Sequence, residues 1–137
     1  MFEAAGADVA FLFARVLFGG ILAFMGLNHF LNLESMAGYA EFKGLPAPTL
    51  SVLASGGLLI FGGLSLISGV LPAIGAGALA LFLLVSAVKM HDFWNAEGED
   101  AQNEMTSFLK NVYGAGAALA FLAVSNATWP YALNIGL

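Results

Sequence analysis

Cysteine and charged residues are what this sequence of 137 residues has least of. It contains no cysteine, which excludes disulfides, thiolate-bound metals and dithiol redox chemistry carried by this chain. Its 4 Lys and Arg residues are too few to form a basic stripe, which excludes nucleic-acid binding. Only 9% of its residues are charged and 60% are hydrophobic, whereas soluble domains have about 25% charged residues. The composition therefore predicts a membrane protein.

Apolar residues gather in runs that are each long enough to cross a bilayer as a helix, which takes about 20 residues. They cover residues 9–30, 50–70, 72–90 and 108–127. Pro72 fits the first turn of a helix, where its missing N–H costs no hydrogen bond, so the second and third runs form a tight antiparallel hairpin. We expect an all-α fold, a transmembrane four-helix bundle with short connections, in a single domain over residues 1–137.

The segments outside the apolar runs add three further expectations. A short amphipathic helix is predicted for Leu33–Phe42, between the first two runs. The first run is expected to be retained, because acidic Glu3 and Asp8 stand where a signal peptide has basic residues. Lys43, Lys89 and Lys110 all fall on one side of the predicted bundle. We expect a multi-pass protein of the cell membrane. The positive-inside rule then favours an orientation in which the side with these lysines faces the cytoplasm.

Arg15 is the charged residue that lies inside the first apolar run. At 1.5 Å per residue it lies about 10 Å from the start of its helix. Asp8 precedes it by two turns on the same face, so Arg15 can snorkel towards Asp8 or towards helix-end carbonyls. The alternative function of this buried charge is contact with an anion or a substrate.

Polar residues mark the ends of three runs, and antiparallel threading brings these ends to the same membrane face. The predicted binding residues are His29, Lys89, His91, Asp92, Trp94, Lys110 and Asn111. Among them His91 and Lys110 are the candidate catalytic residues. Histidine titrates near neutral pH, so this rim is suited to relaying protons or to hydrogen-bonding a quinone headgroup. Alternatively, the lysines and Trp94 anchor the interface, and the histidines satisfy helix-end carbonyls.

Other ligands have less support. Bis-histidine haem would need His29 and His91 to face one cavity, and no other feature points to haem. A metal held by these histidines and Asp92 has no local spacing signature. We therefore predict no metal site, and a haem is not expected.

Two polar motifs are similar to the DoxX family of small four-helix membrane proteins. The first is the "MHDFW" of residues 90–94, and the second is the "FLKN" of residues 108–111. Together with Arg15 and Gly62-Gly63, they extend the resemblance from about Arg15 to Phe121. The acidic loops resemble those of a halophilic archaeal member. The family positions carried over are Arg15, His91, Phe93, Trp94, Lys110 and Asn111.

The sequence departs from the family pattern at two places. Leu59 stands where many members have a glutamate, which weakens any mechanism that needs a buried carboxylate. The turn at residues 71–73 lacks the basic residue that is common there. Members with that base would have this turn and both termini in the cytoplasm, which is opposite to the orientation favoured above.

The resemblance implies an accessory or anchor subunit of a membrane redox system linked to quinone, since some members resemble the small subunit of a thiosulfate:quinone oxidoreductase. The chain has no fingerprint for binding flavin or nicotinamide, so the electron carrier would be the quinone or lie on a redox partner subunit. Whether the chain is itself an enzyme stays open. The second interpretation is a non-enzymatic membrane interaction protein or homo-oligomer, and the third is a small-solute transporter.

Overall fold

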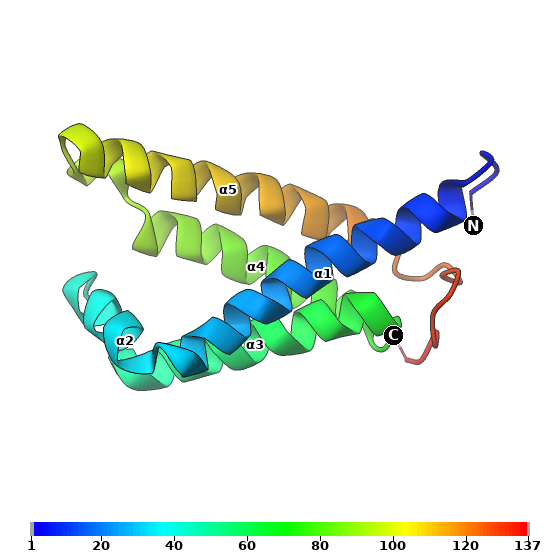
Figure 1. Cartoon of the computed structure of the whole chain (residues 1–137), viewed down its shortest axis with the longest axis horizontal. Coiled ribbons are helices and arrows are strands. Elements are labelled where there is room, and N and C mark those ends of the chain that lie inside the picture. The colour runs from blue at the N-terminus through cyan, green and yellow to red at the C-terminus, as the bar shows by residue number, and fades with distance from the viewer. Residues whose placement is uncertain (1, 137) are drawn as a thin grey trace.

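The computed structural model describes residues 2–136, whose regular structure is helical apart from one isolated bridge between Val70 and Ile135 (Figure 1). The helices are α1 (Ala7–Leu31), α2 (Leu33–Phe42), α3 (Pro48–Ser68), α4 (Pro72–Met90), the 3-10 turn η1 (Phe93–Asn95) and α5 (Gly98–Ala123). The prediction of an all-α fold is confirmed. A simple four-helix bundle is not, because the short α2 makes a fifth α-helix in the described chain.

Three segments of the described chain are long and apolar enough to cross a membrane: Ala7–Leu31, Pro48–Ser68 and Pro72–Asn95. They correspond to the first three predicted runs. The fourth helix of that length, α5, is not among them. It begins at Gly98 rather than at residue 108, because the acidic residues after η1 are helical as well.

Two glycine contacts hold α1 against α3. A Cβ added at Gly19 would lie 2.5 Å from the carbonyl oxygen of Gly63, and one added at Gly26 would lie 2.6 Å from that of Gly56. Real Cβ atoms do not approach backbone this closely, so only glycine fits at these positions. The backbones of α1 and α3 are thus in direct contact, as expected for helices that associate in lipid through small residues.

A tight hairpin joins α3 to α4. Gly69 and Leu71 have positive φ angles of 72° and 51°, and Pro72 begins α4 as the sequence predicts. Beyond the turn, the side chain of Leu79 fills the space above Gly62. These contacts connect two helix pairs, α1 with α3 and α4 with α5. In Figure 1 the pairs lie close together near this hairpin and diverge towards the end where α2 lies.

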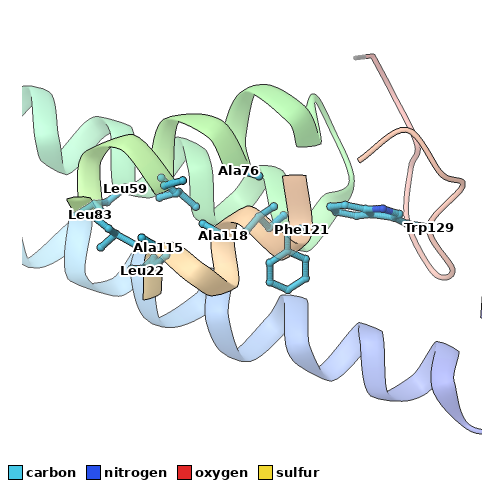
Figure 2. Close-up of a cluster of buried hydrophobic side chains, with 11 residues drawn as sticks. Leu22, Leu59, Ala76, Leu83, Ala115, Ala118, Phe121 and Trp129 are labelled. Atoms are coloured by element: carbon cyan, nitrogen blue, oxygen red, sulfur yellow. The ribbon is translucent and has the colours of Figure 1, made fainter. Parts of the chain in front are cut away.

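The segment after α5 folds back over the hairpin, which the sequence did not predict. Leu133 and Ile135 donate backbone hydrogen bonds to Ser68 (2.8 Å) and Gly69 (3.0 Å). Trp129 is buried and donates from Nε1 to the carbonyl of Val124 at 2.9 Å. Figure 2 shows Trp129 at the end of the core cluster, beyond Phe121. We call residues 124–136 the C-terminal tail.

The glycine contacts make a first prediction. Replacing Gly63 with valine forces α1 and α3 apart, so it should lower the free energy of unfolding by about 1–3 kcal/mol. Thermal melting of the protein in detergent measures this loss. The control is Gly57→Ala in the same helix, where an added Cβ meets nothing within 4 Å. Equal melting temperatures for Gly63→Val and the wild type would show that the contact does not hold the helices together.

Candidate functional site

A cluster of polar side chains connects α2 to the ends of α4 and α5. The Lys43 ammonium, just after α2, lies 2.6 Å from Asp92, which follows α4. On the same side of α2, one turn earlier, the Tyr39 hydroxyl lies 2.7 Å from Glu104 of α5. It also lies 2.8 Å from the carbonyl oxygen of Met90, the last residue of α4. These contacts cross from the α1–α3 pair to the α4–α5 pair.

His91 belongs to the same cluster. Its Nδ1 lies 2.9 Å from the second carboxylate oxygen of Glu104. Glu104 therefore accepts from Tyr39 with one oxygen and from His91 with the other. We call Tyr39, Lys43, His91, Asp92 and Glu104 the latch.

The latch favours the ionised form of Glu104. Burial raises the pKa of this carboxyl, but the hydrogen bonds from Tyr39 and His91 and the positive charge of Lys43 together outweigh burial, so the pKa lies below the ordinary value. Burial also raises the pKa of Tyr39, and the neighbouring Glu104 raises it further. Tyr39 thus keeps its proton and acts as a donor.

A polar cleft of about 650 Å³ opens beside the latch. Its lining comes from α2, η1 and the first turns of α5: Tyr39, Phe42, Lys43, Asp92, Asn95, Ala96, Glu97, Asp100, Asn103 and Glu104. Within residues 2–136, no group of three or more His, Cys, Asp or Glu side chains could hold a metal ion. The nearest carboxylates are already paired with Lys43 and His91.

An apolar groove of about 490 Å³ lies between α1, α4 and α5. Its walls are Ala14, Leu17, Phe18, Ile21, Leu22 and Met25 of α1, Leu83 of α4, and Lys110, Asn111, Tyr113, Gly114, Ala117 and Phe121 of α5. Asn111 is only 4% exposed and lines the groove. The groove thus offers one buried amide and one ammonium in a wall that is otherwise almost wholly apolar.

Arg15 lies fully buried under the C-terminal tail. It donates from Nη2 to the carbonyl of Tyr131 at 3.1 Å. The guanidinium lies 5.4 Å from the ring centroid of Phe11 and 5.5 Å from that of Trp129, close enough for cation–π attraction. Nε and Nη1 find no hydrogen-bond partner in the described chain. This charge is therefore held by aromatic rings and one carbonyl.

The predicted contact of Arg15 with Asp8 is absent within the described residues. One carboxylate oxygen of Asp8 is buried without a hydrogen-bond partner, and the two side chains form no ion pair. The carbonyl that Arg15 does reach belongs to the tail instead of a helix end. The helical spacing could not reveal the C-terminal tail, which has no helical periodicity and covers Arg15.

The structure divides the predicted rim among several places. His91 and Asp92 lie in the latch, whereas Lys110 and Asn111 line the groove. Trp94 is half exposed and packs edge to face on Phe93 and Phe108, with centroids 5.3 and 5.9 Å away.

The other two rim residues join neither site. His29 packs over Gly56 of α3, and its Nδ1 lies 2.8 Å from the carbonyl of Met25, which is inside α1 and not at the helix end. Lys89 is exposed and forms no ion pair within residues 2–136.

Three latch residues were missing from the sequence prediction: Tyr39, Lys43 and Glu104. The signal for the first two was available, since Lys43 directly follows the predicted short helix, is four residues from Tyr39 and therefore lies on the same side. Glu104 lies in the predicted connection between residues 90 and 108, which holds several acidic residues, so nothing distinguished it from its neighbours. Its partners become visible only when α5 is seen to begin at Gly98.

The fold and these sites define a helical membrane protein with a polar latch at one end and an apolar groove. The sequence model of the DoxX family matches residues 10–92, which run from α1 to the residue pair after α4. The chain belongs to the DoxX family. Comparison with curated proteins and with solved structures found no match. Lys110 and Asn111 lie outside the matched residues.

The latch makes a second prediction, on pH. Because the folded-state pKa of Glu104 is lowered, its stabilising effect is present above the ordinary glutamate pKa of 4.5 and is lost as the pH falls through the lower folded value. Melting temperature should therefore fall between about pH 6 and pH 3 more steeply in the wild type than in Glu104→Gln.

The same variant should lower the free energy of unfolding at pH 7 by about 1–3 kcal/mol, because two hydrogen bonds lose their charged acceptor. The control is Glu99→Gln, an exposed glutamate in the first turn of the same helix. If the control flattens the pH profile as much as Glu104→Gln does, the pH dependence has another source.

Proposed function

We propose that this DoxX-family protein is an accessory or anchor component of a membrane redox system, and that it binds a lipid-soluble quinone in the groove between α1, α4 and α5. The observation that carries this proposal is the groove itself. Its apolar walls suit a ring and an isoprenoid chain, and two of its polar groups, Lys110 and Asn111, are donors suited to carbonyl oxygens.

The proposal includes a multi-pass arrangement in the cell membrane, with α5 as the fourth span from Phe108 onwards. Two features of α5 support this. Gly114, Ala115 and Ala118 are buried, which is typical of a membrane helix packed through small residues. The acidic half before Phe108 would then project beyond the lipid, where the latch and the polar cleft meet water.

The position of Asn111 is the strongest chemical argument. This residue is almost wholly buried and lines the groove, so its amide would donate to a ligand carbonyl in an apolar setting, where a hydrogen bond is strong. The nearby Lys110 ammonium would orient the same headgroup and favour negative charge on its oxygen. When bound, the quinone would supply the electron-carrying chemistry, and these side chains would hold it in place.

In this proposal His91 lies away from the quinone. It does not line the groove, and its ring faces Glu104. The electron donor would be a partner subunit, since this chain has no cysteine and no cofactor fingerprint of its own.

A binding experiment tests the groove. The purified protein in detergent is titrated with a decyl-substituted benzoquinone by equilibrium dialysis. We expect saturable binding, weakened roughly tenfold by Asn111→Leu and by Lys110→Met, because each loses a hydrogen bond to the ligand. Lys110→Arg should retain most of the affinity, since it keeps a charged donor.

The matched control is Asn126→Leu, an exposed asparagine beyond α5 that lies outside the groove. Absence of saturable binding by the wild type would refute the quinone site. Affinities that stay equal in the wild type, Asn111→Leu and Lys110→Met would place the quinone elsewhere.

A second function is favoured by the latch. His91 and Asp92 both find partners within the chain, as expected if the "MHDFW" motif serves architecture. The protein would then be a non-enzymatic membrane interaction protein that assembles with further copies or with other subunits. Mass spectrometry of the gently solubilised protein distinguishes the two, because a redox subunit or bound quinone should co-purify only under the first.

A further inference from the structure

The helix α2 is attached to the two helix pairs in different ways. It follows α1 directly and packs on α3, with Ala40 fully buried. Towards the other pair it extends Tyr39 and Lys43, which reach Met90, Asp92 and Glu104. The α1–α3 pair thus carries α2 by packing, and polar side chains fasten it across to the α4–α5 pair.

The opposite ends of the two pairs are joined far more firmly. There α3 and α4 share the hairpin at Gly69 and Leu71, and Gly75 of α4 lies against Ser65. The C-terminal tail is hydrogen-bonded over the same hairpin. The arrangement is a V whose vertex is closed by backbone contacts and whose open side faces α2 (Figure 1).

The groove lies within this V. One wall is α1 and the other is α4 with α5, so its width is set by the separation of the two pairs. Near the vertex the walls meet where Phe18 stacks on Phe121, with centroids 5.7 Å apart. Met25 and Lys110 lie nearer the open side, towards the latch.

We propose that α2 is a strap whose hydrogen bonds and ion pair to α4 and α5 keep the groove narrow, and that their release lets the α4–α5 pair swing outwards and admits a lipid-soluble ligand. A few polar contacts at the membrane surface can open without disturbing the packed vertex, so the strap is the weakest connection between the pairs. The ligand in this inference is that of the proposed function, but the strap motion is tested without any ligand.

The natural absence of cysteine makes the test direct. A single cysteine is placed at Met25 in the groove, and its rate of reaction with N-ethylmaleimide is measured in detergent. Combining it with Tyr39→Phe and Lys43→Met, which remove the strap's hydrogen bonds and ion pair, should speed the reaction roughly tenfold. The matched control combines it with Tyr131→Phe, whose ring is exposed, and Lys43→Arg, which keeps the ion pair.

Equal rates in the strap variant and the control would overturn the proposal. A cysteine at Leu81, exposed on the outer face of α4, shows whether the strap variant remains folded, because its rate should not change. Faster labelling at Met25 without any quinone binding would support the strap and refute the proposed function. Quinone binding with unchanged labelling would support the proposed function and refute the strap.

A second measurement does not depend on a groove residue. Spin labels at Glu41 of α2 and Gln102 of α5, both exposed, report the distance across the open side of the V. Double electron–electron resonance should show a longer and broader distribution in the strap variant than in the control. Identical distributions would also overturn the proposal.

Discussion

Direct backbone contact between α1 and α3 is the constraint on which the other features depend. In lipid, bringing helices together gives no hydrophobic gain. The favourable free energy of association must therefore come from close packing at glycine. Gly19 meets Gly63 and Gly26 meets Gly56, two helical turns further along, which fixes both the crossing and the rotation of α1. That rotation turns Arg15 towards the tail and the face from Ala14 to Met25 towards the groove.

Polar groups in this chain fall into two kinds. Those of the latch are paired with each other, and each explains how two helix ends are held together. Arg15 is buried with two nitrogens left without a hydrogen-bond partner, which packing alone does not explain, and the buried Asn111 lines the groove. Ligand contacts are therefore expected in the apolar interior and not at the histidines.

The sequence was sufficient wherever local chemistry decides structure. The bounds of Leu33–Phe42 and of the helix that begins at Pro72 agree with the structure, because apolar periodicity and proline define them. The sequence was not sufficient where contacting residues are far apart in the chain, as for Glu104 and Tyr39, which are 65 positions apart. It also did not predict the C-terminal tail, which has no periodic pattern. The rim was predicted as one site because all its residues lie near one membrane face. His91 contacts Glu104 of α5, whereas Lys110 lies six residues, about 9 Å, further along that helix and lines the groove.

The cover over Arg15 has a consequence for biosynthesis. The carbonyl that accepts its hydrogen bond comes 116 positions later in the chain, and the Trp129 ring beside it is almost as distant. A ribosome therefore delivers the charged α1 to the membrane long before its cover has been made. Until then the guanidinium must interact with water or with a lipid phosphate. The last steps of assembly replace that temporary partner with aromatic rings.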